Sequence, residues 1–195
     1  MNLNKLNSVL IVAELSANHN GSLDTAIETI KAAKRAGADA IKLQTYTADT
    51  ITLDTKRDDF LLKQGTIWEG KYLYDLYKQA FTPWEWHKQL FEFSKKQGLI
   101  CFSSPFDLTA VDFLESLENP IYKIASFEIT DIPLIRKVAS KGKPVIISTG
   151  IATKQDIELA IATCKNEGNH EIALLKCTSS YPAPISEANL TMIKD

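Results

Sequence analysis

Short runs of consecutive hydrophobic residues recur along the chain, and most are separated by stretches with helical periodicity. One such stretch, Leu23 to Ala36, places Ala26, Ile27, Ile30 and Ala33 on a single face. Because the runs are continuous rather than alternating, they are typical of strands buried in a parallel sheet. The six runs are Val9 to Ala13, Ala40 to Leu43, Leu99 to Phe102, Ile121 to Ala125, Val145 to Ile147 and Ile172 to Leu175. The pattern predicts an α/β fold.

Turn and cap signals support the same alternation of strands and helices. Four glycines stand between a helical stretch and the next run, where a left-handed helix cap is expected. They are Gly37, Gly98, Gly142 and Gly168. Helix starts are indicated by the capping-box patterns Thr82-Pro-Trp-Glu and Thr153-Lys-Gln-Asp and by Asp107. A further helix, after the sixth run, is expected to begin near Ser186.

The number of units decides between two architectures. An eight-stranded barrel of alternating strands and helices needs ~250 residues, and this chain has 195. A doubly wound open sheet usually carries a glycine-rich phosphate turn after its first strand, whereas the first turn here reads A-N-H-N-G from Ala17. We therefore predict a TIM-type (β/α)8 barrel, with about six of its eight strand-helix units present in residues 1–195.

Polar residues lie at the carboxyl ends of the hydrophobic runs. In a TIM-type barrel these ends point to one face, which carries the active site. The residues concerned are Glu14, Lys42, Gln44, Ser103, Ser104, Lys123, Ser126, Ser148, Thr149 and Lys176. This register predicts an enzyme whose site is assembled from six separate segments.

One connection breaks the rhythm of short loops. From Tyr46 to about Gly70 the chain is polar, mixed in charge and much longer than the usual two to six residues. It leaves the catalytic end of the second predicted strand, so it is placed to act as a lid. The alternative is a surface excursion packed by Phe60, Leu61 and Trp68.

Composition excludes several classes of protein. With 45% hydrophobic and 24% charged residues and a net charge of -2, the chain has no basic footprint for nucleic acid and no polybasic membrane surface. The apolar stretch Val9 to Ala13 is too short for a signal sequence or a membrane span, which predicts a cytoplasmic protein. Three cysteines without paired spacing indicate free thiols rather than disulfides or a zinc site.

The candidate chemistry is that of an anion site. Lys42, Lys123 and Lys176 would raise the positive potential at the barrel mouth and suit a small substrate with several negative charges. A Schiff-base role for a lysine is the alternative. The serines could bind anions or cap helices. Glu14 is expected either to pair with a lysine or to act as a general base.

Histidine and cysteine add little to this prediction. His19, His87 and His170 fall on different elements, so the chain shows no histidine metal pair and we predict no metal ligand in it. Cys177 is interpreted as a small buried residue rather than a nucleophile, because no histidine is predicted beside it.

Several blocks of sequence carry a family resemblance. They are A-E-L-S-A-N-H-N-G from Ala13, K-L-Q-T-Y from Lys42, F-S-S-P-F-D from Phe102, Y-K-I-A-S from Tyr122, I-S-T-G from Ile147 and K-C-T-S-S-Y-P from Lys176. In these blocks the chain resembles the sialic acid synthase family, and within it the pseudaminic acid synthase branch. Sialic acid synthases typically have His-Cys-Thr-Asn where this chain has Lys176-Cys-Thr-Ser, which suggests a different sugar.

The resemblance implies a reaction and the residues that serve it. It implies a transferase that condenses phosphoenolpyruvate with an amino-sugar aldehyde, a diacetamido-trideoxy-altrose in the pseudaminic branch, to give a nine-carbon acid and phosphate. N-acetylneuraminate or legionaminic acid synthesis is the alternative. Glu14, Lys42 and Lys123 are the expected catalytic residues. The expected substrate-binding residues are Gln44, Ser104, Ser126, Ser148, Ser179 and Tyr181.

The same resemblance implies parts that this chain is not expected to contain. They are a divalent metal, Mn or Mg, bound by histidines of later strands, the remaining barrel strands, and a C-terminal antifreeze-like domain that completes a homodimer. The chain is thus expected to be the N-terminal part of a synthase. Two rival functions remain: a metal-free aldolase with Lys123 as a Schiff-base lysine, and an inactive anion-binding fragment.

Overall fold

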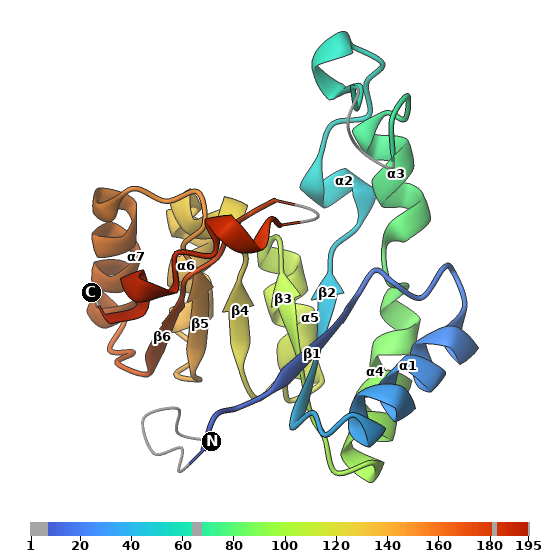
Figure 1. Cartoon of the computed structure of the whole chain (residues 1–195), viewed down its shortest axis with the longest axis horizontal. Coiled ribbons are helices and arrows are strands. Elements are labelled where there is room, and N and C mark those ends of the chain that lie inside the picture. Colours follow the sequence, from blue (N-terminus) through green and yellow to red (C-terminus); the bar gives the residue numbers. More distant parts are fainter. Residues whose placement is uncertain (1–7, 64–67, 181–182, 195) are drawn as a thin grey trace. The chain divides into compact units, whose positions relative to one another are not determined.

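A computed structural model describes residues 8–63, 68–180 and 183–194 of the chain (Figure 1). The chain divides into two compact units, and each is described by itself. The first unit is Leu10–Leu117, and the second contains the chain from Glu118 onward. Among the described residues, no helix is both long and apolar enough to cross a membrane.

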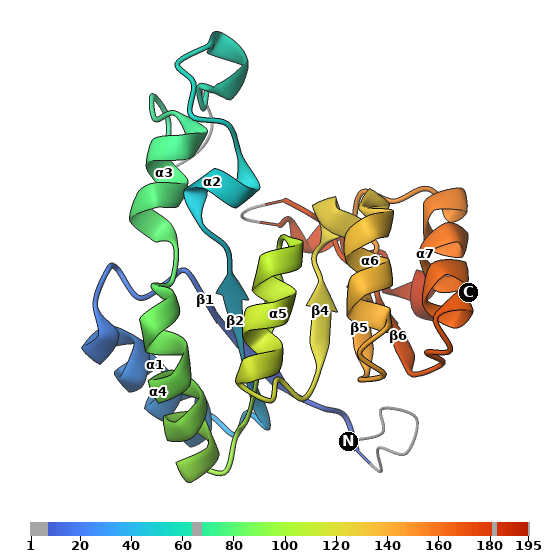
Figure 2. The ribbon, with the colours of Figure 1, turned by 180° about the vertical axis from the view of Figure 1, so that it is seen from behind.

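The first unit holds three parallel strands, with β2 paired to β1 on one side and to β3 on the other. Its elements are β1 (Val12–Ser16), α1 (Leu23–Arg35), β2 (Ala40–Thr45), α2 (Ala48–Ile51), η2 (Asp58–Phe60), α3 (Leu73–Ala80), α4 (Trp84–Lys96), β3 (Ile100–Pro105) and α5 (Leu108–Ser116). Helices α4 and α5 both pack on β3, and α1 packs on α4 (Figure 2).

The core of the first unit lies between these helices and one face of its sheet. Leu15, Ile41, Leu43 and Cys101 from the three strands join Leu90 of α4 in one buried cluster. Because successive residues of a strand point to opposite faces, the residues between them in the sequence face away from the helices. This alternation places Glu14, Lys42, Gln44, Phe102 and Ser104 together on the other face.

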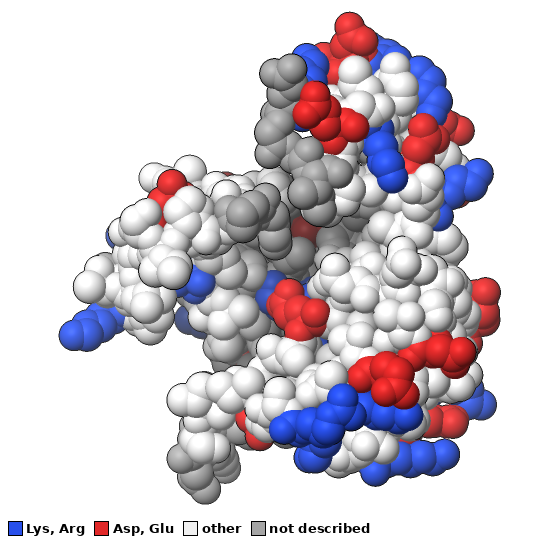
Figure 3. All heavy atoms as spheres, turned by 45° about the vertical axis from the view of Figure 1, so that its right-hand side comes forward, with Lys and Arg blue, Asp and Glu red and all other residues white. Residues whose placement is uncertain are grey.

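The long connection of the first unit is folded rather than extended. It contains α2, η2 and α3, and an isolated antiparallel bridge joins Leu61 to Tyr72. Lys56 pairs with Asp75, and the Tyr74 hydroxyl donates to Asp49 over 2.9 Å. Figure 3 shows acidic and basic side chains interspersed over this excursion, so it presents no patch of one sign in that view. Whether it closes over a ligand stays a prediction.

The second unit has the same strand-helix alternation. Its elements are β4 (Tyr122–Ile124), η3 (Ser126–Thr130), α6 (Ile132–Ala139), β5 (Val145–Ser148), α7 (Lys154–Asn166), β6 (Ile172–Leu175), η4 (Ile185–Glu187) and η5 (Leu190–Lys194). Strand β5 pairs in parallel with β4 on one side and β6 on the other. Helices α6 and α7 pack against each other.

Predicted and observed elements agree closely, with three corrections. The four glycines do adopt positive φ, between 65° and 89°. The first strand, however, begins at Val12, so Glu14 lies inside it rather than at its end. The helix expected from Ser186 is wrong, because the chain there forms the short 3-10 turns η4 and η5, with Asn189 at φ 45° between them. The capping box at Thr82 is also wrong, because its hydroxyl bonds to Ser16 instead.

Candidate active site

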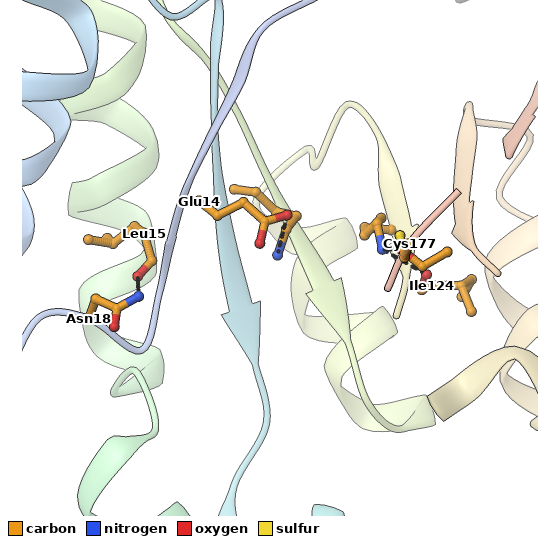
Figure 4. Close-up of polar contacts among 8 residues, drawn as sticks. Glu14, Leu15, Asn18, Ile124 and Cys177 are labelled. Carbon is orange, nitrogen blue, oxygen red and sulfur yellow. Dashed lines mark hydrogen bonds and ion pairs between the residues drawn. The ribbon is translucent and has the colours of Figure 1, made fainter. Parts of the chain in front are cut away.

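The first polar cluster, Glu14, Lys42, Gln44 and Ser104, lies on the face of the first unit's sheet that turns away from its helices. Glu14 pairs in register with Lys42, and their side chains form an ion pair of 3.6 Å (Figure 4). The Lys42 side chain is 6% exposed and that of Glu14 is 56% exposed. Burial lowers the pKa of Lys42, and the Glu14 carboxylate opposes that shift. The buried Lys42 ammonium is therefore paired with the solvent-accessible Glu14 carboxylate.

Ser104 completes this cluster from the neighbouring strand. It pairs in register with Gln44, and the residue is 1% exposed. Its hydroxyl is buried and has no hydrogen-bond partner among the residues that the structure describes. Because buried polar groups in proteins are nearly always paired, an unpaired hydroxyl on the same sheet face as a buried lysine marks a place for a polar ligand atom.

The second polar cluster lies in the second unit and centres on Ser148 at the end of β5. Lys123 on β4 donates from Nζ to Ser148 Oγ over 2.6 Å and to the Ile124 carbonyl over 3.0 Å, while Cys177 Sγ donates to the same serine oxygen over 3.2 Å (Figure 4). A serine oxygen has two lone pairs, and both are used here. The hydroxyl hydrogen of Ser148 is thus left to donate to a ligand.

A second serine in this unit has the same arrangement. Ser126 Oγ, in η3 directly after β4, accepts from the Ile151 amide over 3.1 Å and from the Ser179 hydroxyl over 2.8 Å. Its hydrogen is also left to donate. Gly150 makes this contact geometrically feasible, since an added Cβ would collide with Ser179 Oγ and lie 2.9 Å from Ser126 Oγ.

Glu128 belongs to this region and was missed by the sequence analysis. Its Oε2 atom is buried without a hydrogen-bond partner among the described residues. Burial raises the pKa of Glu128, and a backbone hydrogen bond and the positive charge of Lys123 work against that rise. The sequence prediction considered only the last residues of each hydrophobic run, whereas Glu128 lies inside η3, the turn that begins at Ser126. The available signal was a carboxylate two residues after Ser126.

The remaining predicted residues have less definite positions. Lys176 donates to the Cys177 carbonyl over 3.0 Å, so it is turned to its own backbone. Tyr181 lies outside the described residues.

The described part of the chain contains no group of three or more His, Cys, Asp or Glu side chains that could hold a metal ion, so the described residues do not form a site for the expected Mn or Mg. We assign no ligand to it.

Comparison with known proteins identifies the family. A sequence model described as the NeuB family matches residues 29–195, which is most of the chain. The chain belongs to the NeuB family. It is 50% identical to pseudaminic acid synthase of Campylobacter jejuni subsp. jejuni serotype O:2, over 97% of this chain and 55% of that protein. It is 38% identical to N,N'-diacetyllegionaminic acid synthase of the same strain, over 95% of this chain and 56% of that one.

The structural comparison covers the whole chain. The crystal structure of N-acetylneuraminic acid synthetase from Leptospira borgpetersenii serovar Hardjo-bovis, in complex with citrate, matches with a TM-score of 0.85 at 31% identity, over 100% of this chain and 64% of that one. The likeness confirms the TIM-type barrel prediction, and the described residues contain six of its strands, the first five of them followed by helices. The chain spans about half the length of the curated relatives it matches.

Proposed function

We propose that this chain supplies the phosphoenolpyruvate-binding part of a pseudaminic acid synthase. Such an enzyme joins phosphoenolpyruvate to 2,4-diacetamido-2,4,6-trideoxy-altrose and releases phosphate. The observation that carries the proposal is the second polar cluster, where a lysine ammonium and two serine hydroxyls with hydrogens left to donate suit an anion. The higher identity to the pseudaminic than to the legionaminic synthase, 50% against 38%, supports the choice of sugar.

Each residue then has a role that follows from its chemistry. Lys42 and Lys123 would neutralise the carboxylate and phosphate of phosphoenolpyruvate, with Ser104, Ser126 and Ser148 donating hydrogen bonds. The resemblance to the sialic acid synthase family is the reason that we assign residues of both clusters to phosphoenolpyruvate.

The accessible Glu14 carboxylate is suited to stabilise positive charge at C2 of phosphoenolpyruvate, the carbon that bears the enol oxygen. When the enol methylene attacks the sugar aldehyde, positive charge develops next to the enol oxygen, and a nearby carboxylate stabilises it. Water then adds to C2 of phosphoenolpyruvate, and one of its protons goes to the alkoxide formed from the aldehyde. The new C2 hydroxyl gives its proton to the departing phosphate as the C2–O bond breaks, which leaves the nine-carbon keto acid and inorganic phosphate. Gln44, Ser179 and Tyr181 are assigned to substrate binding on the resemblance. The metal and the homodimer stay predictions from the same resemblance, and no step is derived through the metal.

Two measurements on the 195-residue chain test the proposal. Calorimetry should show phosphoenolpyruvate binding that Lys123→Met weakens at least tenfold. Lys154→Met should leave it unchanged, because that side chain is 85% exposed and lies on α7. Absence of binding by the unmodified chain would overturn the phosphoenolpyruvate assignment.

Turnover separates this function from its rivals. Phosphate release and mass spectrometry of the products should be followed with the diacetamido sugar and with N-acetylmannosamine, at equal concentrations and with Mn²⁺ supplied. A nine-carbon acid formed preferentially from the diacetamido sugar supports the proposal, and preference for N-acetylmannosamine contradicts the sugar assignment. Trapping of pyruvate on Lys123 by borohydride would favour the aldolase instead. Binding without any product would favour the anion-binding fragment over a chain that catalyses the reaction by itself.

A further inference from the structure

Three polar side chains lie buried behind the first polar cluster, on the helix side of the sheet. Thr45 of β2, Ser103 of β3 and His87 of α4 are each 0% exposed. Thr45 Oγ1 lies 2.9 Å from His87 Nε2 and 2.7 Å from Ser103 Oγ. His87 Nδ1 lies 3.2 Å from the Pro83 carbonyl oxygen. Buried hydroxyls and an imidazole cost stability unless they are hydrogen-bonded, and these three bond to one another.

We assign a direction to each hydrogen bond in this group from the contact between Nδ1 and the Pro83 carbonyl, although the backbone of Gln44 and Trp84 also bonds to the ring. The Pro83 oxygen can only accept, so the assignment places the hydrogen of His87 on Nδ1. In the neutral ring Nε2 is then an acceptor, and it receives the hydrogen of the Thr45 hydroxyl. Thr45 Oγ1 in turn accepts from the Ser103 hydroxyl. Burial, which lowers the pKa of His87 to about 4, keeps the ring neutral and preserves this order.

Thr45 and Ser103 are the sequence neighbours of two residues on the substrate face of the sheet. Thr45 directly follows Gln44, and Ser103 directly precedes Ser104, while Gln44 and Ser104 are partners in the β2–β3 ladder. Side chains alternate along a strand, so a bond between Thr45 and Ser103 on one face fixes the spacing of Gln44 and Ser104 on the other.

The same turn of α4 also holds two further segments of the first unit. The Trp84 indole donates to the Tyr46 carbonyl over 3.2 Å, at the point where the long connection leaves β2. Thr82, just before α4, donates to the Ser16 carbonyl over 3.3 Å at the end of β1. His19, whose Nδ1 accepts from the Gly21 amide, lies 3.2 Å from Thr82 Oγ1 and donates to it from Nε2.

We infer that His87 is a positioning residue that acts through Thr45 and Ser103 on the substrate-binding residues Gln44 and Ser104. The inference rests on the proposed function, because it specifies how the first polar cluster is held ready for phosphoenolpyruvate. Apolar side chains would suffice to pack α4 on the sheet. A directional chain of bonds adds a defined register between the two strand ends, and Ser104 is the residue whose hydroxyl awaits a ligand.

Matched threonine variants of the 195-residue chain test the inference. Thr45→Val keeps the shape and removes the hydroxyl, whereas Thr45→Ser keeps the hydroxyl. Thr163→Val is the control, because the hydroxyl of this buried threonine donates to the Leu159 carbonyl of its own helix, over 2.8 Å, and lies in the second unit. Phosphoenolpyruvate affinity is measured by calorimetry below the melting temperature of every variant. We expect at least a tenfold loss for Thr45→Val, a loss below threefold for Thr45→Ser, and none for Thr163→Val.

The ring of His87 gives a second readout that a general loss of packing would not change. Nitrogen-15 NMR of the imidazole should show the hydrogen on Nδ1 in the unmodified chain, and an Nε2-H ring overturns the assigned direction. If Thr45→Val does not fold, Ser103→Ala replaces it and should weaken phosphoenolpyruvate binding without changing the tautomer. Unchanged affinity in the variant that folds, Thr45→Val or its replacement Ser103→Ala, refutes the positioning role. No binding by the unmodified chain refutes the proposed function and the role together, while the ring signals still decide the bond direction.

Discussion

The buried imidazole of His87 makes the stability of this protein depend on pH in a predictable direction. Burial lowers the pKa of His87 from its ordinary 6.5 to about 4, and the backbone carbonyls around it and the charge of Glu85 oppose the shift only in part. Between these two values the unfolded chain binds a proton that the folded chain does not. The free energy of unfolding therefore falls as the pH is lowered through this window.

The size of the loss follows from the two pKa values. One unit of pKa difference corresponds to about 1.4 kcal/mol, so the complete transition at His87 is worth on the order of 3 kcal/mol. Between about pH 7 and about pH 5 the linkage relation gives a loss of roughly 2 kcal/mol. Domains of this kind unfold with roughly 5–15 kcal/mol, so the change is large enough to measure.

The assay is a series of urea titrations at several pH values. Unfolding is followed by the fluorescence of Trp84 and Trp86, which lie on α4 together with His87. In His87→Gln the amide oxygen can still accept from Thr45, but the side chain does not titrate, so the loss on acidification should shrink by roughly 2 kcal/mol. Ile30→Val, a truncation in the core of the first unit, should lower stability by about 1 kcal/mol at every pH and keep the unmodified slope. The reasoning is refuted if His87→Gln retains the full pH dependence.

Three further predictions concern the polar clusters. Glu14→Gln removes the charge that opposes desolvation of Lys42, so NMR titration should show a still lower lysine pKa, and a rise would contradict the ion pair. Ser148→Ala removes the oxygen shared by two donors and should weaken phosphoenolpyruvate binding roughly tenfold in calorimetry, with an unchanged affinity arguing against this cluster. Gly150→Ala should displace Ser179 and weaken the same binding at least as much, while a shift in melting temperature without loss of affinity would indicate a purely structural glycine.

Hydrophobic runs predicted the strands well because burial in a parallel sheet requires them, but they did not set the strand limits. Val9 and Ile11 belong to the first run, yet they are 79% and 52% exposed. Pairing in the structure starts where Val12 meets Ala40, and an irregularity between Glu14 and Ser16 then shifts the register. Such limits depend on the neighbouring strand, which local hydrophobicity does not report.

Cap signals were informative where the partner is local and misleading where it is distant. The box at Thr153 forms as expected, because its hydroxyl and Asp156 are three residues apart on one helix turn. The equivalent pattern at Thr82 does not form, because the hydroxyl bonds to a carbonyl on β1, 66 residues away. A tertiary hydrogen bond of this kind competes with the local one, and only the folded chain shows which is made.

In the candidate site, too, the sequence predicts which residue types are present but not which partners they bond. Ser103 and Ser104 are adjacent hydroxyls at one strand end, and the sequence predicts both on the site face. Alternation along β3 separates them: Ser103 bonds Thr45 on the helix side, while the hydroxyl of Ser104 is buried without a partner among the described residues. A shift of one residue along β3 therefore separates Ser103, which positions the site, from Ser104, whose hydroxyl can bind a ligand. The pairing of Gln44 with Ser104 fixes this register.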